Sequence, residues 1–273
     1  MKYRIAAVSY VNTLPFLYGL QRPEMQEMVD VILAHPARCA DLLEKGEVDI
    51  ALCPVGALPE LGTYHVITDY CIGCDGPVRT VSIYSNKPLS ELTHVILFPE
   101  SRTSNLLVQI LNTEYWKYDI EFLPGAPDPE LVDRVPPEAS TVAQGPFSPV
   151  SSISSGSSGF LFIGDICFQK EKEYAYRTDL GQSWKEWTGM PFAFACWVSR
   201  ERIEDHVAET LNAAFAAGIK NIDNLVYPPE MEAAVLREYL KKNISYELDA
   251  GKKEAMGRFL ELTPGPSLTK RGE

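Results

Sequence analysis

The sequence lacks the motifs that mark most metal, nucleotide and serine-hydrolase enzymes. HExxH, the P-loop, GxSxG and GxGxxG are all absent, and the four histidines form no pair at metal-ligand spacing. Cys71 and Cys74 form the one CxxC pair, whereas a zinc site of this kind needs a second pair. Gly73 and Gly76 beside them favour a tight turn. We therefore expect no metal site.

Long apolar runs and basic blocks are missing as well. No stretch reaches the roughly 18 apolar residues of a membrane-spanning helix, and the run Ile5–Val8 is too short for the core of a signal peptide. The net charge of −12, without any Lys/Arg-rich block, argues against nucleic acid and anionic membranes as partners. Because we find no export signal, we expect reduced cysteines and a cytoplasmic protein.

What is present is an alternation of short apolar segments and helical ones. Segments typical of buried strands occur at 3–8, 29–33, 49–53, 66–70, 78–84, 95–98, 160–163 and 192–199. Helical patterns follow several of them, and longer helices are predicted at 202–221 and 229–242. This alternation is typical of an α/β fold with a largely parallel sheet. The pattern restarts near residue 87, which predicts a second lobe.

Several predicted strands end in polar turns that lead into helices. These turns are Ser9–Thr13, Pro54–Leu58 and Ser101–Asn105, and Gly164-Asp165 ends a further strand. In open α/β sheets, ligands bind in the crevice at the carboxyl ends of the strands. Turns from two lobes can therefore face one cleft, although each can also be an ordinary capping turn.

The turn Ser101–Asn105 gathers three hydroxyls and a guanidinium at the expected start of a helix. Unpaired backbone N–H groups give that end of a helix a partial positive charge. The turn can therefore hold a carboxylate or phosphate, with Ser9, Asn12 and Thr13 contacting polar groups from the other side. An ordinary N-cap at Ser101 accounts for the same residues without a ligand.

Six blocks of the sequence carry a resemblance to a known family. They are SYVNTLPF, CPVGALPEL, TDYCIGCDGPVRTVSIYSN, SRTSNLL, FIGD and TGMPFAFACW, in that order within residues 4–199. Together they resemble the chorismate dehydratases of the futalosine route to menaquinone, the MqnA-type enzymes of the MqnA/MqnD family. The resemblance implies an α/β, two-lobed fold of the periplasmic-binding-protein-like type II class, with mainly parallel mixed sheets and a hinge cleft. Lobe I would comprise residues 1–86 and 192–273, and lobe II residues 87–191.

The resemblance also implies a reaction and a set of site residues. Chorismate, a dicarboxylate, would lose water to give 3-(1-carboxyvinyloxy)benzoate, and no cofactor is needed because aromatisation of the ring drives the reaction. Asn12 and Thr80 resemble the family's catalytic positions, which orient the substrate and assist the elimination. The expected substrate-binding residues are Ser9, Thr13, Arg79, Ser82, Ser101, Arg102, Thr103, Ser104, Asn105, Gly164 and Asp165. Arg79 can instead pair with a surface carboxylate, and a homodimer is an option.

The proton acceptor is left open between two groups. No histidine lies in a matched block, so either the substrate's enolpyruvyl carboxylate or Asp165 takes the proton. We favour the substrate, because Asp165 can equally be a structural residue at a strand end.

Two other functions compete with the dehydratase. One is a non-catalytic solute-binding protein for small carboxylates, which the same fold allows. The other is the sister enzyme that forms 1,4-dihydroxy-6-naphthoate, which we expect to use a histidine, and the predicted strand-end turns contain none. Residues 134–159, rich in Pro, Ser and Gly, are predicted to form a long loop that lies apart from the matched blocks.

Overall fold

The computed structural model describes residues 2–125 and 157–264. Its strands are β1 (Tyr3–Val8), β2 (Val29–Ala34), β3 (Ile50–Pro54), β4 (His65–Cys74), β5 (Val81–Ser85), β6 (His94–Leu97), β7 (Glu121–Pro124), β8 (Ser158–Ile163), β9 (Tyr176–Asp179), β10 (Phe192–Ser199) and β11 (Ser245–Glu247). Its α-helices are α1 (Leu14–Leu20), α2 (Pro23–Gln26), α3 (Pro36–Glu44), α4 (Arg102–Leu111), α6 (Cys167–Lys170), α7 (Leu180–Thr188), α8 (Asp205–Lys220), α9 (Ala233–Lys242) and α10 (Ala250–Leu262). Shorter helical turns are η1 (Val11–Thr13), η2 (Val55–Leu61), η3 (Leu89–Glu91), η4 (Asn112–Trp116), η6 (Gly164–Ile166) and η7 (Ile222–Asn224).

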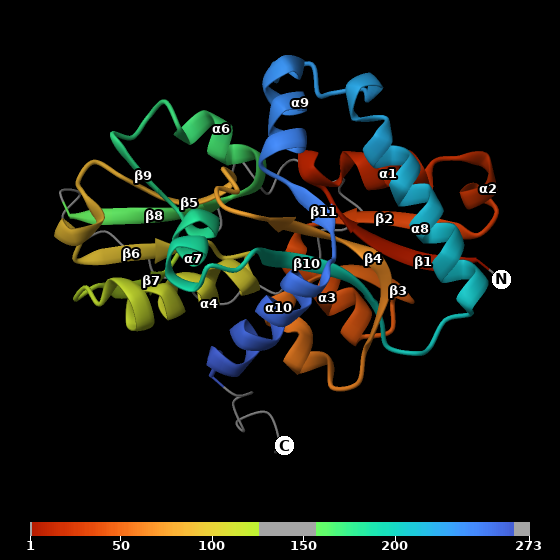
Figure 1. Cartoon of the computed structure of the whole chain (residues 1–273), viewed down its shortest axis with the longest axis horizontal. Helices are drawn as coiled ribbons and strands as arrows, with labels where there is room; N and C mark the ends of the chain where they lie inside the picture. Colours follow the sequence, from red (N-terminus) through yellow and green to blue (C-terminus); the bar gives the residue numbers. More distant parts are fainter. Residues whose placement is uncertain (1, 126–156, 265–273) are drawn as a thin grey trace.

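The described strands form two mixed sheets that lie side by side (Figure 1). The first has the order β11-β4-β10-β3-β1-β2, and the second has the order β7-β6-β8-β5-β9. Strand β1 runs parallel to β2 and β3, whereas β10 runs antiparallel between β3 and β4. The mixed α/β architecture is confirmed. Among the described strands, however, five of the nine pairings are antiparallel, because β10, β11, β5 and β9 run against their neighbours.

Within residues 2–125 and 157–264, the strand order shows two passages of the chain between the sheets. The chain leaves the first sheet after Cys74 at the end of β4, enters the second at Val81 in β5, and returns through α7 to β10. Strand β5 thus lies in the second sheet, whereas the predicted first lobe extended to residue 86. Cys71 and Cys74, expected in a turn, lie inside β4 as buried free thiols, because the turn begins only after Cys74.

The segment predicted as a loop at 134–159 lies outside the described residues up to residue 156. Ser158 and Gly159, at its end, already belong to β8. A Cβ atom at Gly159 would lie 2.7 Å from a Leu92 side-chain atom and 2.8 Å from one of Ile83. Gly159, which by composition looks like part of a loop, therefore lies in a strand where neighbouring side chains leave no room for a larger residue.

Packing of α1 against α8 fixes the chain just after the turn at the end of β1. A Cβ atom at Gly218 would lie 1.7 Å from the carbonyl oxygen of Pro15, and one at Gly19 would lie 2.3 Å from that of Ala214. Only glycine allows the two helix backbones to approach so closely. Since α1 begins immediately after η1, this contact also holds the polar residues of η1 in place.

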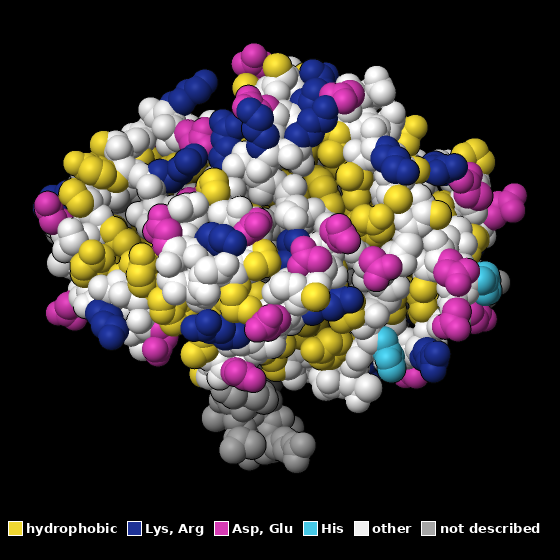
Figure 2. Space-filling model, viewed as in Figure 1, with side chains coloured by type: hydrophobic (Ala, Val, Ile, Leu, Met, Phe, Trp, Pro, Cys, Tyr) yellow, Lys and Arg dark blue, Asp and Glu magenta, His cyan; other side chains and the backbone are white. Residues whose placement is uncertain are grey.

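Basic side chains of α9 are paired with nearby carboxylates. Figure 2 shows Lys and Arg side chains gathered at the top, over α9. Arg237 and Lys241 pair there with Asp223, and Lys242 pairs with Glu238.

The helices of the described residues include none with the length and apolar character that a membrane span requires.

Candidate active site

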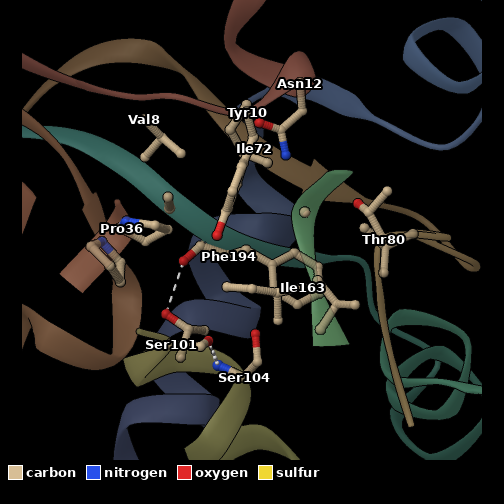
Figure 3. Close-up of a pocket in the computed structure, with 16 residues that line it drawn as sticks. Val8, Tyr10, Asn12, Pro36, Ile72, Thr80, Ser101, Ser104, Ile163 and Phe194 are labelled. Carbon is tan, nitrogen blue, oxygen red and sulfur yellow. Dashed lines mark hydrogen bonds between the residues drawn. The ribbon is translucent and has the colours of Figure 1, made fainter. Parts of the chain in front are cut away.

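A narrow cavity of about 60 Å³ lies where strand ends and helix starts from both sheets meet (Figure 3). The lining residues lie at strand ends, at helix starts, in the central strands or in the connection between β4 and β5: Val8, Tyr10, Asn12, Pro36, Pro54, Ile72, Val78, Thr80, Val81, Ser101, Thr103, Ser104, Ile163, Gly164, Phe194 and Ala195. Most of the lining is apolar, with a few hydroxyls and one amide.

None of these lining residues carries a charged side chain. An anion in the cavity would therefore be held by neutral hydrogen-bond donors and by the N-terminus of α4 rather than by a cation. The described residues also contain no group of three or more His, Cys, Asp or Glu side chains that could hold a metal ion. The cavity suits a ligand with an apolar body and a small number of polar groups.

Two polar walls face each other across the cavity. We call Asn12 and Thr80 the Asn12–Thr80 wall, and Ser101, Thr103 and Ser104 the α4 wall. Figure 3 shows Asn12 and Thr80 on one side and Ser101 and Ser104 on the opposite side, with the Tyr10 side chain between them. The sequence analysis expected all five wall residues in the site, and the structure brings them to one cavity.

Asn12 is held on three sides. Its backbone carbonyl accepts a hydrogen bond of 2.9 Å from the Tyr246 hydroxyl, and its side-chain oxygen accepts one of 3.2 Å from Thr13. The backbone N–H of Val11 donates to both carboxylate oxygens of Asp165, at 3.1 and 3.2 Å. Thr13 and Asp165 therefore position η1, and neither lines the cavity.

Thr80 lies in a connection that is fixed by a buried carboxylate. Asp179 accepts hydrogen bonds from the backbone N–H groups of Val78 at 3.1 Å and Arg79 at 2.7 Å. These bonds hold Arg79 at a φ of 68°, which non-glycine residues rarely adopt. The Thr80 carbonyl accepts from the N–H of Gly164 at 2.9 Å, so the backbone around Thr80 is anchored on both sides.

Two buried tyrosines from the last part of the chain complete this wall. The Tyr239 hydroxyl lies 2.6 Å from Thr80 Oγ1, and it also interacts with the Asn12 side chain. Burial, reinforced by the charge of Asp165, raises the pKa of Tyr239 above its ordinary value, although the bonds to Thr80 and Asn12 lower it. Burial likewise raises the pKa of Tyr246. Both phenols therefore remain protonated and able to donate near neutral pH.

Tyr10 enters the cavity because residue 164 is glycine. Gly164 has a φ of +72°, and a Cβ atom on it would lie 2.7 Å from the Tyr10 ring. The ring thus packs against the Gly164 backbone, and Figure 3 shows its hydroxyl directed into the cavity. Burial, followed by the charges of Glu100 and Asp165, raises the pKa of Tyr10 well above its ordinary value. The phenol is a neutral donor for a ligand.

The α4 wall has the geometry of a capped helix. Ser101 is the N-cap, and its side chain accepts a hydrogen bond of 3.1 Å from the N–H of Ser104. Thr103 Oγ1 accepts from the N–H of Gly56 and donates to the carbonyl of Phe194, both at 3.0 Å, so it joins α4 to residues next to the first sheet. The N-cap prediction for Ser101 is confirmed. The Ser104 hydroxyl points into the cavity (Figure 3).

Arg102 and Asn105 do not contribute to the expected anion cradle. The Arg102 guanidinium makes ion pairs of 2.5 Å with Asp41 and 2.6 Å with Glu60, and it does not line the cavity. The Asn105 side chain accepts from the N–H of Phe98 and donates to its carbonyl, which ties α4 to the end of the preceding strand. Both side chains point away because successive helix positions face different directions.

Arg79, Ser82 and Ser9 also lie outside the cavity lining. The Arg79 guanidinium donates to both carboxylate oxygens of Glu171, at 2.9 and 3.0 Å, so the predicted surface pair is what forms. Ser82 is fully buried on β5, and Ser9 is exposed. In this structure none of these three side chains reaches the cavity lining.

His35 directly follows β2, at the same edge of the sheet as the turn after β1. Its Nδ1 lies 2.9 Å from Glu100 Oε2, and its ring centroid is 6.3 Å from that of Tyr10 in an edge-on arrangement. The predicted polar turns contain no histidine, and His35 lies outside them as the residue that precedes α3. His35 itself does not line the cavity.

Sequence reasoning missed Tyr10, Tyr239 and Tyr246. Tyr10 lies between the predicted site residues Ser9 and Asn12, so its position in the first block was a usable signal. Tyr239 and Tyr246 lie far along the chain from the matched blocks, and nothing local distinguishes them from core tyrosines.

A family model described as menaquinone biosynthesis matches residues 3–142 and 140–264 of the chain. Together the two matches cover the parts of both sheets that build the cavity.

Several solved structures share the fold. Protein AF1704 from Archaeoglobus fulgidus has a TM-score of 0.66 and 14% identity, with 96% of each chain covered. The Candida albicans CA3427 gene product, described as having the generic periplasmic binding protein structural fold, has a TM-score of 0.59 and 13% identity over 100% of this chain and 99% of that one. An ABC transporter from Parabacteroides distasonis has a TM-score of 0.59 and 16% identity over 96% and 91%. At such identities the likeness concerns the fold alone, and it confirms the predicted periplasmic-binding-protein-like architecture.

Proposed function

The chain belongs to the menaquinone biosynthesis family, of the MqnA/MqnD type, and from this membership we propose that it is a lyase that dehydrates chorismate to 3-(1-carboxyvinyloxy)benzoate. The observation that carries the proposal is the pairing of Asn12 and Thr80 opposite the start of α4 in one uncharged cavity. In this proposal the ring of the substrate lies between the apolar residues Val8, Ile72 and Ile163, and its polar groups face the polar residues at both ends of the cavity.

Substrate binding in this proposal depends on neutral donors. One carboxylate of chorismate lies at the N-terminus of α4, where Ser101 and Ser104 and the helix dipole favour negative charge. The Tyr10 hydroxyl is a further donor within the cavity. In a protein with a net charge of −12, local donors of this kind must overcome a field that repels anions.

The reaction breaks the ring C–O bond to the hydroxyl and the C–H bond on the neighbouring ring carbon. The C–H electron pair forms the double bond that completes the aromatic ring, while a base takes the proton and passes it to the departing hydroxyl, so that one water is released. Asn12 and Thr80 orient the ring and stabilise charge on the departing hydroxyl by preorganised hydrogen bonds. We propose that the substrate's enolpyruvyl carboxylate takes the proton, because the Asp165 carboxylate is bonded to the N–H of Val11 and does not line the cavity.

Incubation of the purified protein with chorismate tests the proposal directly. We expect chorismate to disappear while the benzoate forms in equal amount. Chromatography and mass spectrometry measure both compounds. If chorismate binds, as measured by titration calorimetry, but no product forms, the protein is a binding protein for small carboxylates.

Asp165→Asn distinguishes the two proton acceptors. Asparagine keeps an oxygen that can accept from Val11, so the position of η1 is preserved while the basic group is lost. With the substrate as base, we expect kcat to stay within about threefold of wild type. A variant that binds chorismate normally, retains its melting temperature and has no turnover would identify Asp165 as the base instead.

The position of His35 favours one competing activity, formation of 1,4-dihydroxy-6-naphthoate. Its ring contacts Tyr10 and pairs with Glu100 close to the cavity. His35→Gln separates the two activities: a dehydratase should retain its turnover, whereas an enzyme that depends on a histidine base should lose it.

A cytoplasmic location is part of the proposal, and the six cysteines, all free and buried, are consistent with it.

A further inference from the structure

Tyr239 connects the two residues that the proposed function places at the reacting ring. Its phenol oxygen lies 2.6 Å from Thr80 Oγ1 and also interacts with the Asn12 side chain. The residue is 1% exposed and does not line the cavity, so it reaches a ligand only through these two side chains. Tyr239 lies on α9, 159 residues further along the chain than Thr80.

The Tyr239 ring is held rigidly from the side of the second sheet. The centroid of the Tyr239 ring lies 5.2 Å from that of Phe168 in an edge-on arrangement. The Arg79 guanidinium lies over the Phe168 ring, 5.0 Å from its centroid. Arg79 is fixed in turn by its paired hydrogen bonds to Glu171. A ring packed in this way keeps its hydroxyl in one direction, and this packing gives Arg79 a role away from the substrate.

A phenol has one hydrogen to donate. When Tyr239 donates to Thr80 Oγ1, the hydrogen of Thr80 is left for a group in the cavity. When it donates to Asn12, the Asn12 amide is fixed instead, while the Tyr239 oxygen can accept from Thr80. Without the phenol, the Thr80 hydroxyl rotates freely about its C–O bond, and the direction of its hydrogen is no longer defined.

We propose that Tyr239 is a positioning residue that orients the Thr80 hydroxyl and the Asn12 side chain as one hydrogen-bonded unit toward the reacting ring. The inference rests on the proposed function, because it assigns the unit to the elimination step. Since Tyr239 acts through groups that matter most when the C–O bond breaks, its loss should lower kcat more than it raises KM.

Tyr239→Phe tests the inference, because it removes the hydroxyl and keeps the ring against Phe168. We expect kcat to fall about tenfold or more, with KM changed less than twofold. Tyr227→Phe is the matched control: its hydroxyl donates to the Ile222 carbonyl at 2.6 Å, away from the cavity. The two variants should lose similar stability, and only Tyr239→Phe should lose turnover.

A double variant decides whether Tyr239 acts through Thr80. If the residues form one unit, adding Tyr239→Phe to Thr80→Ala should lower kcat less than twofold further, whereas independent roles would multiply the two losses. Multiplied losses, or equal losses of kcat in Tyr239→Phe and the Tyr227→Phe control, would overturn the inference.

Chorismate affinity separates this inference from the proposed function when it is measured by titration calorimetry on wild type, Tyr239→Phe, Thr80→Ala and the double variant. If wild type binds chorismate without turnover, the dehydratase proposal fails. The hydrogen-bonded unit of Tyr239, Thr80 and Asn12 is then tested by affinity: the losses of the two single variants should not multiply in the double variant. If wild type neither binds nor converts chorismate, both proposals are overturned. If wild type is active and the losses multiply, only the positioning role falls.

Discussion

On the α4 wall, hydroxyl groups bond to backbone groups: Ser101 accepts from Ser104 N–H, and Thr103 bridges the backbones of Gly56 and Phe194. On the Asn12–Thr80 wall, by contrast, phenol hydroxyls of Tyr239 and Tyr246 from the last part of the chain are among the partners. The first wall is fixed by backbone groups. The second depends on side chains brought from far away in the sequence.

This difference suggests a division of labour between the walls. A helix N-terminus offers donors whose positions barely change, which suits the binding of a carboxylate in both ground state and transition state. A wall of side-chain donors, each set by another side chain, can be tuned to the charge that develops on a departing group. Substitutions on the two walls should therefore affect different kinetic constants.

Thr80→Ala and Ser104→Ala test this division most directly, with the largest expected effect. We expect Thr80→Ala to lower kcat by about 10²- to 10³-fold, the usual loss for a donor that acts in the transition state. Ser104→Ala should raise KM for chorismate several-fold, about 1 kcal/mol of binding, with kcat retained. Steady-state kinetics on both variants measure the two constants.

Ser82→Ala is the control for this pair. Its hydroxyl is buried two positions from Thr80 but outside the cavity lining, so the variant should keep both kcat and KM. If Thr80→Ala changed mainly KM, or Ser104→Ala mainly kcat, the assignment of binding and chemistry to separate walls would be reversed.

Gly164→Ala should produce the next largest effect, because it displaces the ring between the walls. Any side chain at a φ of +72° is strained, and here the added Cβ would also lie 2.7 Å from the Tyr10 ring. Gly189 has the same φ of +72° with nothing within 4 Å of its Cβ position. Gly189→Ala should therefore cost about 1 kcal/mol of unfolding free energy and no activity.

Gly164→Ala should cost more stability than Gly189→Ala and should lower kcat/KM about tenfold or more. Chemical denaturation and steady-state kinetics on both variants provide the comparison. Equal behaviour of the two glycine variants would show that the contact between Tyr10 and Gly164 has no part in shaping the cavity.

How much of this site the sequence predicts depends on how local each signal is. Strand ends followed by polar turns are local patterns, so Asn12, Ser101 and the meeting of turns from both lobes could be predicted. The N-cap at Ser101 is equally local, because the accepting oxygen and the donating N–H are three residues apart.

Long-range pairing is what the sequence does not reveal. Arg102 was expected to bind an anion, but Asp41 and Glu60 reach it from the other lobe, and no local pattern shows that they approach. Tyr239 lies on α9 between the buried residues Leu236 and Leu240, so its spacing indicates only a core position. The antiparallel course of β10 is another such case, since an apolar run of eight residues does not specify its direction.

Arg102→Gln should have a smaller effect, and it separates the predicted cradle from the observed ion pairs. Because its guanidinium pairs with Asp41 and Glu60, each more than a quarter exposed, we expect KM to rise no more than about fivefold. Asp41→Asn should give a change of similar or smaller size, since it removes one of the two ion pairs of Arg102. Kinetics at two salt concentrations measure both variants.

A rise in KM of a hundredfold or more for Arg102→Gln, with Asp41→Asn unaffected, would instead mean that the guanidinium binds a substrate carboxylate. In that case the α4 wall would act through a charge, and the contrast between the walls would lie in their charge rather than in their hydrogen-bond partners.

Asp179→Asn should have the smallest effect, and it shows whether the carboxylate beneath Thr80 stabilises the Asn12–Thr80 wall through its charge. Burial raises the pKa of Asp179, although bonds from Gln182, Arg79 and Val78 lower it. Asparagine still offers an oxygen to these N–H groups, so we expect a loss of about 1 kcal/mol or less in unfolding free energy.

The pH dependence of this difference has a definite sign. Between the ordinary carboxyl pKa, about 3.9, and the raised pKa of the folded state, Asp179 binds more protons folded than unfolded. The stability of wild type relative to Asp179→Asn should therefore fall as pH rises through this window and then level off, as urea denaturation at a series of pH values would measure. A relative stability that increased with pH would mean that the N–H donors outweigh burial, and that the charge of Asp179 itself holds the Thr80 connection in place.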